Sequence, residues 1–481
     1  MNSGAIAAVD VGASSGRVVV GHVGPDLLRA EEIHRFVNEP VRLPGGLYWD
    51  VLRLFHEVQE GLRGASRAAG SLRTIGIDTW GVDYGLVDDA GELVGNPVHY
   101  RDARHARGME RVHDIVPPER LYTQNGLQVL PFNTLYQLAA APEDVAPPSS
   151  QTMLLIPNLL GYWLTGVMAA ETTNASTTGL LDARSQTWAE GLILELGLRA
   201  SMFPPLCEPG DALGPVLATV AGVAGLPGAP IVTSVGSHDT ASAVVAVPAD
   251  GHDFAYVSCG TWALVGLELE KPILTDASRT ANFTNETGVD GRVRYLRNVM
   301  GLWLLQESLR TWERSGAAED LGELLAGAGQ IPSGGPVINP DDPSFLPPGD
   351  MVRRIEAACD KANQPRPTSK PALVRCILDS LALAFARTVG DATRLAGRNV
   401  DVIHLVGGGA RNELLCQLTA DACGRPVVAG PVEATALGNI LIQARSIGLA
   451  TGTLESLRAL VRSTQSLKRF EPRLGSEPIN F

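Results

Sequence analysis

Lysine is scarce in this sequence, and its scarcity argues against one large class of nucleotide-binding proteins. The chain of 481 residues contains only Lys271, Lys361, Lys370 and Lys468, and none of them follows a glycine. The P-loop signature GxxxxGK(S/T) is therefore absent. The GxGxxG pattern of dinucleotide-binding folds is also missing from the predicted turns between strands and helices.

Motifs for a metal site built from protein ligands alone are absent as well. The six cysteines show no CxxC spacing and no HExxH sequence occurs, so we expect no zinc site. Cys359 and Cys376 flank a proline-containing loop and could come close to each other. We expect reduced thiols, as is usual for a cytoplasmic protein.

Basic charge and long apolar runs are also in short supply. The formal net charge of −13 disfavours nucleic acids and anionic membranes as partners. The first ten residues contain no basic side chain and Asp10 interrupts their apolar run, so we expect no signal peptide. No apolar run is long enough to span a bilayer. We therefore expect a cytoplasmic protein, and the sequence leaves its oligomeric state open.

The apolar content that is present suffices for more than one domain. With 45% hydrophobic and 19% charged residues, the length favours two or three domains. Strands at 5–11 and 18–23, joined by a turn at 12–17, predict a β-hairpin. Residues 254–267 predict a second hairpin, in which Gly260 takes the place of Gly12. Either this likeness is coincidental, or the chain contains two related halves, which we assign to residues 1–247 and 248–481.

Hydrophobic periodicity predicts the remaining elements. We expect strands at 74–78, 402–406 and 426–429, and helices at 51–62, 154–165, 218–226, 412–423 and 434–447. A helix beginning at Asn298 would bury Leu302, Leu305, Leu309 and Trp312, and a long helix would begin at Pro371. Residues 142–150 and 331–349 are predicted loops because they are rich in proline and polar residues.

The stretch around Asp239 is the strongest candidate for chemistry. Residues 230–235 predict a buried strand and residues 240–247 a helix that Pro248 ends. At the helix N-terminus, the helix dipole and free N–H groups should lower the pKa of Asp239 and keep it ionised. Such a carboxylate can accept the proton of a hydroxyl group. The alternative is that Asp239 only caps the helix.

Glycine-rich turns follow three short apolar strands, at residues 12–17, 259–261 and 407–409. Glycine lets the backbone approach a phosphate closely, and neighbouring N–H groups can donate to its oxygens. Ser14, Ser15 and Thr261 add hydroxyl donors, and Arg17 adds a cation. Each turn alone could serve only the turn geometry. Together with Asp10 and Asp239 at strand ends, they offer the parts that phosphoryl transfer to a hydroxyl requires.

At these motifs the sequence resembles a known family. The segment 10–17, DVGASSGR, is similar to the first phosphate loop of the FGGY carbohydrate kinases, which belong to the actin/hexokinase/Hsp70 ATPase superfamily. Residues 405–412, 420–422 and 433–438 resemble that family's adenine-site pattern. Within the family, the similarity is greatest to members that phosphorylate L-rhamnulose, through the segments 75–83, 100–102, 130–136, 237–242, 298–306 and 429–433.

The resemblance implies an α/β protein with two RNase H-like, actin-like ATPase domains flanking a central cleft. It implies phosphorylation of L-rhamnulose at O1 with ATP and Mg²⁺ as cofactors. One alternative is a kinase for another ketose, such as fuculose or xylulose, because a single hydroxyl can decide specificity. A second is a non-catalytic or chaperone-type ATPase of the same superfamily, which Asp239 and the segment 75–83 argue against.

The resemblance also implies roles for individual residues. Asp239 would be the general base, and Asp10 would help to hold the metal, directly or through water. Contacts to the sugar would come from Gly81, His238, Asp239, Thr240 and Asn298. Contacts to ATP would come from Ala13, Ser14, Ser15, Gly16, Arg17, Thr261, Gln306 and Gly409. Asn298 and Gln306 are eight residues apart, so they would lie on nearly the same face of one helix.

Overall fold

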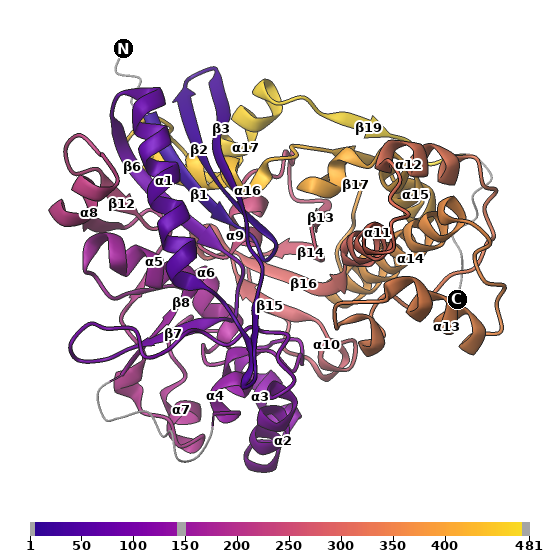
Figure 1. Ribbon diagram of the computed structural model, residues 1–481, viewed down its shortest axis with the longest axis horizontal. Helices are drawn as coiled ribbons and strands as arrows, with labels where there is room; N and C mark the ends of the chain where they lie inside the picture. The colour runs from indigo at the N-terminus through magenta and orange to yellow at the C-terminus, as the bar shows by residue number, and fades with distance from the viewer. Residues whose placement is uncertain (1–4, 142–150, 474–481) are drawn as a thin grey trace. The chain divides into compact units, whose positions relative to one another are not determined.

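The computed structural model describes residues 5–141 and 151–473 (Figure 1), so the predicted loop at 142–150 lies outside the described residues. The chain forms two compact units, each assembled from separate segments. The first unit contains the chain up to Asp250 together with Glu268–Tyr295 and Glu433–Gln465. The second contains Gly251–Leu267, Leu296–Val432 and the chain from Ser466. The division at 247/248 stays a prediction about family domains.

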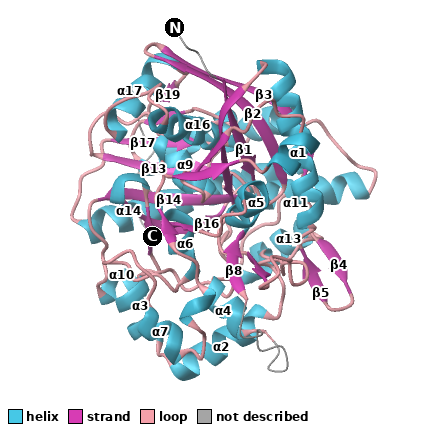
Figure 2. Cartoon of the chain, turned by 90° about the vertical axis from the view of Figure 1, so that its left-hand side faces the viewer, coloured by secondary structure: helices cyan, strands magenta, loops and turns pink. Residues whose placement is uncertain are grey.

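The main sheet of the first unit has the strand order β11-β12-β6-β1-β2-β3, and its strands β1, β2 and β3 are labelled in Figure 2. Its hairpin of β1 and β2 is the predicted one, and β1 pairs in parallel with β6 on its other side. The strands are β1 Ala5–Val11, β2 Ser15–Gly24, β3 Leu27–Val37, β6 Leu72–Thr79, β11 Ala212–Pro215 and β12 Ile231–Thr233. Every residue of β1 is buried, as expected for an apolar run in the middle of a sheet.

A second large sheet has the order β15-β16-β14-β13-β17-β18-β19. Its strands are β13 Phe254–Cys259, β14 Trp262–Leu269, β15 Thr284–Thr287, β16 Val293–Met300, β17 Val402–Val406, β18 Val427–Ala429 and β19 Lys468–Phe470. The series β16-β14-β13-β17-β18 repeats the series β3-β2-β1-β6-β12, each with an antiparallel hairpin followed by a parallel strand. The predicted internal repeat is therefore confirmed by the strand order.

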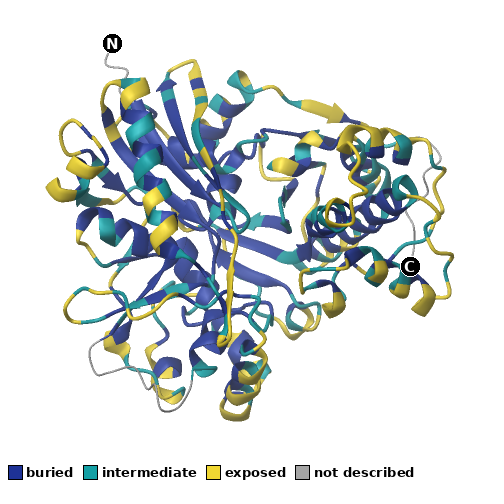
Figure 3. Cartoon of the chain, in the orientation of Figure 1, coloured by how far each residue is buried: buried dark blue, intermediate teal, exposed yellow. Residues whose placement is uncertain are grey.

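The helices of the first unit include α1 Val51–Ala69, which contains the helix predicted at 51–62. Val51, Leu54, Val58 and Leu62 are buried, while the outer face of α1 is exposed (Figure 3). The other helices of this unit are α2 His105–Ile115, α3 Pro118–Asn125, α4 Thr134–Ala139, α5 Ile156–Thr165, α6 Thr172–Ala175, α7 Glu190–Glu195, α8 Ala218–Val223, α9 Asp239–Val245, α10 Asp276–Thr280, α16 Ala434–Ser446 and α17 Leu454–Thr464. Short strands pair as β4 Val41–Leu43 with β5 Gly46–Tyr48, β7 Tyr84–Val87 with β8 Thr152–Leu155, and β9 Ala170–Glu171 with β10 Leu206–Cys207.

The second unit contains α11 Trp303–Arg314, α12 Leu321–Gly329, α13 Met351–Lys361, α14 Lys370–Ala396 and α15 Glu413–Cys423. The long helix α14 begins as predicted, because Ser369 caps it by accepting from the backbone N–H of Ala372 and Pro371 occupies its first turn. Gly397, with a φ of 59°, ends it in the left-handed conformation that glycine tolerates. Among the described residues, no helix has both the length and the apolar character needed to cross a membrane.

Two predicted helices differ from the structure. Residues 154–155 end strand β8, so helix α5 begins only at Ile156. Asn298 does not begin a helix, because it lies inside strand β16, and α11 begins at Trp303. The β-branched and aromatic residues Val293, Tyr295 and Val299 favour a strand here, and the capping preference of asparagine was the weaker signal.

Helix α16 comes from the C-terminal part of the sequence and yet completes the core of the first unit. It packs on α9 through Gly438, where an added Cβ atom would lie 1.8 Å from the carbonyl oxygen of Ser242. It packs on the main sheet through Ile440, which occupies the space beside Gly21 of β2. Only glycine therefore fits at position 438 in the contact between α16 and α9.

We predict that Gly438→Ala lowers the free energy of unfolding by about 3 kcal/mol or more, since the new methyl group meets a backbone carbonyl that cannot move alone. Thermal unfolding followed by circular dichroism measures the effect. The control is Gly390→Ala, in the interior of α14, where an added Cβ meets nothing within 4 Å. There the gain in helix propensity should stabilise the protein by up to about 1 kcal/mol. Equal behaviour of the two variants would contradict the close α9–α16 contact.

Candidate active site

The turn between β12 and α9 carries the predicted base. The backbone N–H of Thr79, at the end of β6, donates to the carbonyl of Ser237 at 2.9 Å. His238 is the N-cap residue with extended backbone, and Asp239 is the first residue of α9. The side chain of Asp239 accepts from the hydroxyl of Thr240 at 3.1 Å. Asp239 is therefore not the N-cap residue, and the turn sets it near the carboxyl end of the sheet strands, where ligands bind in open α/β sheets.

The expected low pKa of Asp239 is wrong. Burial raises its pKa above the ordinary value, and the charge of Asp10 adds to the rise. His238 and Thr240 oppose these effects without cancelling them. The expectation considered only the helix dipole, whereas loss of hydration is the larger effect here. A raised pKa brings this carboxylate closer to the value that suits a general base at neutral pH.

The carboxylate of Glu171 holds the turn between β12 and α9 in place through hydrogen bonds. It accepts from the backbone N–H and hydroxyl of Ser237 at 2.9 and 2.6 Å. It also accepts from the N–H and hydroxyl of Thr173 at 2.7 and 2.6 Å, and from the N–H of Asn174 at 3.2 Å. Glu171 has no exposed surface, and burial raises its pKa despite these hydrogen bonds. The buried side chain of Glu171 thus connects the segment Thr172–Ala175 to Ser237, two residues before Asp239.

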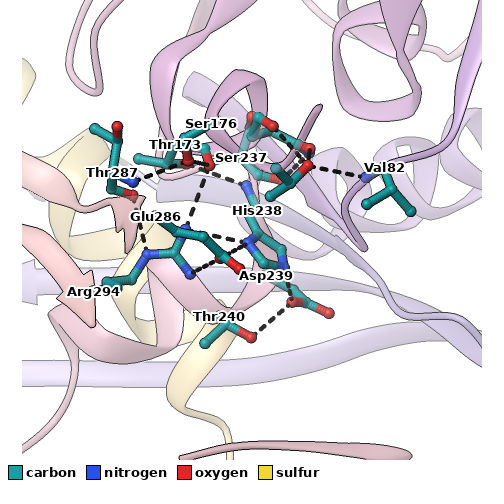
Figure 4. A network of polar contacts seen from close by, with 12 residues as sticks. Val82, Thr173, Ser176, Ser237, His238, Asp239, Thr240, Glu286, Thr287 and Arg294 are labelled. Atoms are coloured by element: carbon teal, nitrogen blue, oxygen red, sulfur yellow. Dashed lines mark hydrogen bonds and ion pairs between the residues drawn. The ribbon is translucent and has the colours of Figure 1, made fainter. Parts of the chain in front are cut away.

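His238 lies in a network of buried charges beside Asp239 (Figure 4). Its Nε2 atom is 3.5 Å from Oδ1 of Asp239. On the other side of the ring, Nδ1 is 3.2 Å from Nη2 of Arg294 and 3.2 Å from Oε2 of Glu286. Arg294 and Glu286 form an ion pair at 3.0 Å, and the side chain of Arg294 has no exposed surface. The imidazole is therefore fixed between the candidate base and a buried ion pair.

The first glycine-rich turn is tighter than expected. Strand β2 already begins at Ser15, so Ser15, Gly16 and Arg17 lie in the strand and only Gly12–Ser14 form the turn. The N–H of Gly12 donates to the carbonyl of Ser15 at 2.9 Å. Asn38 closes the turn from the side by donating to the carbonyl of Gly12 at 2.8 Å. Ala13 and Ser14 remain at the tip of this hairpin.

Arg17 and Asp10 face each other across the β1–β2 hairpin and form an ion pair. The Nε and Nη2 atoms of Arg17 donate to Oδ2 of Asp10 at 2.9 and 2.6 Å. The Nη1 atom of Arg17 donates to Glu433, the N-cap residue of α16. Burial would lower the pKa of Arg17, but the charge of Asp10 outweighs it and the net shift is upward. The cation predicted for ATP is thus paired with the carboxylate predicted for the metal.

A second buried carboxylate, Asp78 at the end of β6, lies next to these groups. Its Oδ2 atom accepts from Asn439 of α16 at 2.6 Å, and its Oδ1 atom has no hydrogen-bond partner among the described residues. Burial raises the pKa of Asp78 well above its ordinary value, with further contributions from Asp10 and Asp239. Three carboxyl groups therefore lie close enough for their charges to interact. No group of three His, Cys, Asp or Glu side chains within residues 5–141 and 151–473 is arranged to hold a metal ion by itself.

Gly81 lies in a strained turn after β6. Val82 has a φ of 69°, which is rare for a β-branched residue. Its N–H donates to the hydroxyl of Thr177 at 3.1 Å and its carbonyl accepts from Thr134 at 2.6 Å. Backbone strain of this kind persists where the surroundings enforce it, often at binding sites.

The carboxylate of Asp83 fixes the aromatic side chains around this turn. It accepts from the indole N–H groups of Trp49 and Trp80 at 2.5 and 3.0 Å, and from the amide of Gln137 at 2.8 Å. Burial raises the pKa of Asp83 to about 7 against these hydrogen bonds. Trp80 is itself buried and its ring centroid is 4.1 Å from that of Trp49. Through these contacts Asp83 organises the turn.

The remaining predicted residues belong to the second unit. Thr261 follows β13 and its hydroxyl lies 3.5 Å from Oε1 of Gln306 in α11. Gly409 packs so closely that an added Cβ atom would lie 2.5 Å from Sγ of Cys259. Asn298 lies in β16 and Gln306 in α11, so the prediction that one helix face carries both is wrong.

Several residues of the site were not found by sequence reasoning. Glu171, Glu286 and Arg294 lie in no recognised motif, and each becomes conspicuous only through full burial of a charged side chain. Glu171 is 66 residues away from its partner Ser237 in the sequence, and Glu286 and Arg294 are 48 and 56 residues away from His238. Their spacing in the sequence alone could not have predicted that these residues lie together.

The strand order shows two related halves, and in the first of them carboxylates lie at the strand ends. Two family models match the chain: the N-terminal domain of the FGGY family of carbohydrate kinases over residues 5–246 and the C-terminal domain over residues 255–447. The chain belongs to the FGGY family of carbohydrate kinases. The protein is therefore a member of a family of enzymes and not a chaperone-type ATPase.

Curated relatives match almost the whole chain. It is 43% identical over 469 residues to the rhamnulokinase of Enterobacter sp. (strain 638), covering 97% of this chain and 94% of that protein. It is 39% identical over 468 residues to the rhamnulokinase of Bacteroides thetaiotaomicron, covering 97% and 95%.

Solved structures show the same fold at lower identity. The gluconate kinase of Lactobacillus acidophilus aligns with a TM-score of 0.81 at 17% identity, over 99% of this chain and 95% of that one. The glycerol kinase of Plasmodium falciparum with ADP aligns with a TM-score of 0.76 at 14% identity, over 98% and 94%. The predicted two-domain fold of this family is confirmed.

We predict that Glu171→Gln destabilises the protein by about 2–4 kcal/mol and lowers kcat. Both carboxylate oxygens accept from backbone N–H groups, so either orientation of the new amide sets an NH₂ group against a donor. The displaced turn would carry Asp239 with it. Thermal unfolding and steady-state kinetics measure the two effects.

The matched control is Glu195→Gln, which removes a surface ion pair with Arg120. It should leave both the unfolding temperature and kcat almost unchanged, because exposed ion pairs contribute little. If Glu171→Gln behaved like this control, the turn would be held by something other than Glu171.

Proposed function

We propose that the protein phosphorylates L-rhamnulose at O1, using ATP and Mg²⁺, with Asp239 as the general base. The relatives named rhamnulokinase, which match nearly the full chain, support this substrate. The observation that carries the mechanism is the partly buried carboxylate of Asp239 on a rigid strand-to-helix turn, with its pKa raised by burial. A base of raised pKa accepts a hydroxyl proton more readily than an ordinary aspartate does.

On the sugar side, Gly81, His238, Thr240 and Asn298 would contact the ketose. At Gly81 an added Cβ atom would lie 3.1 Å from the side chain of Thr177, and His238 presents its Nε2 atom beside Asp239. As the hydroxyl at C1 attacks the γ-phosphorus, its proton would pass to Asp239 and the bond to the ADP oxygen would break. The oriented turn lowers the entropic cost of that alignment.

On the nucleotide side, Ala13, Ser14, Ser15, Gly16 and Arg17 would meet the phosphates, and Thr261, Gln306 and Gly409 would contact ATP as well. Arg17 is held by Asp10, which fixes its guanidinium group in place. When the phosphates arrive, they would compete with Asp10 for the same cation.

The carboxyl groups suit a magnesium ion that is shared with the phosphates. Asp10, Asp78 and Asp239 interact unfavourably with one another, and a cation beside them would relieve that repulsion. Because Mg²⁺ keeps several waters and takes few protein ligands, a site without three clustered ligands fits it. We propose that Asp10 holds the ion, directly or through water. When bound, the ion would neutralise charge on the phosphate oxygens.

We predict that Asp239→Asn lowers kcat by about 10²–10⁴-fold while ATP binding changes little, because the lost proton acceptor acts in the transition state. Coupled ADP-release kinetics and calorimetric ATP titration measure the two effects. The matched control is Asp276→Asn, which changes the first residue of another helix, α10, and should leave kcat unchanged. Near-normal turnover of the Asp239 variant would mean that the proton goes elsewhere.

We predict the highest kcat/KM for L-rhamnulose among L-rhamnulose, L-fuculose, D-xylulose and glycerol. The relevant measurement is ADP release with each substrate at equal concentration, against a background without sugar. Turnover of L-fuculose or D-xylulose in the absence of turnover of L-rhamnulose would replace the proposed substrate with another ketose. A site that hydrogen-bonds each hydroxyl should reject a sugar with one inverted centre.

A further inference from the structure

A fully buried arginine contacts the ring of His238 on the side away from Asp239. Arg294, in β16, donates through Nε to the carbonyl of Thr287 at 3.0 Å. Its Nη2 atom lies 3.4 Å from the carbonyl of Thr173 and 3.2 Å from Nδ1 of His238. These acceptors, shown in Figure 4, orient the guanidinium plane toward the imidazole. Sequence reasoning assigned no role to Arg294.

Two groups lie equally near Nδ1 of His238, since Oε2 of Glu286 and Nη2 of Arg294 are each 3.2 Å from it. Of these, Oε2 of Glu286 is poorly aligned for a hydrogen bond with donors of the described residues. Arg294 does make a hydrogen bond to Nδ1. Glu286 is instead the counter-ion of Arg294, at 3.0 Å from Nη1. A guanidinium group can only donate, so the nitrogen that accepts from it carries a lone pair and no proton.

We propose that Arg294 is a positioning residue that fixes His238 as a neutral imidazole with its proton on Nε2. The hydrogen on Nε2 then faces Oδ1 of Asp239, 3.5 Å away, and any sugar oxygen beside it. The tautomer of a histidine is set by the partner of its other ring nitrogen, and here that partner is a permanent donor. This proposal rests on the proposed function, in which Asp239 is the base and His238 contacts the sugar.

The arrangement supplies a donor to the base without adding a net charge. Arg294 and Glu286 form a neutral pair, so they add no net charge beside Asp239. With Nε2 protonated, His238 donates toward one carboxylate oxygen of Asp239 and favours its ionised form. With Nδ1 protonated, the Nε2 lone pair would face the carboxylate and repel it. The tautomer therefore decides whether His238 supports or opposes the base.

The tautomer can be observed directly by ¹⁵N NMR of protein labelled at histidine, with the His238 signals assigned as those absent from His238→Gln. In the native protein without ligands near pH 7.5, we expect Nδ1 to show the shift of an unprotonated ring nitrogen and Nε2 that of a protonated one. A native protein with the proton on Nδ1, or with both nitrogens protonated, would overturn the proposal whatever the variants do.

The variants remove the donor while keeping the buried charge balanced. In Arg294→Met/Glu286→Gln, we expect His238 to lose the fixed Nε2–H tautomer and kcat/KM for the sugar to fall about ten-fold, with the KM for ATP unchanged. Arg294→Lys restores a donor that cannot accept and should recover most of the Nε2–H signal. An unchanged tautomer in the folded double variant would contradict the role of Arg294.

The matched control is the other fully buried arginine pair of the first unit, Arg458 with Glu268 at 2.7 Å. Arg458→Met/Glu268→Gln should lower the unfolding temperature similarly and leave the His238 tautomer unchanged. A tautomer shift in this control would mean that loss of any buried pair disturbs the site. Failure of the proposed function would appear separately, as normal turnover of Asp239→Asn, because the NMR measurement needs no turnover.

Discussion

The hydrogen bonds that Glu171 accepts from Ser237 are the constraint on which the candidate site depends. A carboxylate with no exposed surface is stable only where donors surround it, and here the donors belong to the turn that carries His238 and Asp239. Burying the charge is costly unless every donor stays in place. The hydrogen bonds to Glu171 therefore restrict the turn to nearly one geometry. The carboxylate that we propose as the base is therefore placed by another carboxylate, to which we assign no part in the chemistry.

The same arrangement explains how three aspartates can lie near one another. Asp10 is neutralised by Arg17, Asp78 is held by Asn439, and Asp239 retains partial access to solvent. The negative charge of each aspartate is compensated in a different way, so the three groups respond differently to changes in their surroundings. Differences of this kind between neighbouring carboxyl groups allow one of them to act as a base while the others bind or orient.

The order of the elements in each half could be predicted from the sequence because it depends on local patterns. The apolar runs at 5–11 and 402–406 are buried strands, and the face of α1 is as its periodicity indicates. Asn298 shows where local signals fail, since its capping preference competed with the strand propensity of its neighbours and lost. The pKa of Asp239 was mispredicted for a related reason: burial is a tertiary property, and a helix N-terminus was the only part visible in the sequence.

Among the site residues, those in family motifs could be proposed from the sequence, whereas those that hold them could not. Glu286 in β15 and Arg294 in β16 contact His238 although they are 48 and 56 residues away from it in the sequence. Nothing in their neighbouring residues distinguishes them from surface charges. Long-range pairing of charges therefore remains the part of the site that requires coordinates.

Helix α16 has a consequence for synthesis of the chain. The β1–β2 hairpin and α9 are translated early, but the surface that they bury against Ile440 and Gly438 is supplied some two hundred residues after α9, as the positions show. Until that helix emerges from the ribosome, the early segment exposes apolar area that is normally covered. The first unit therefore completes this part of its core only after α16 has been translated.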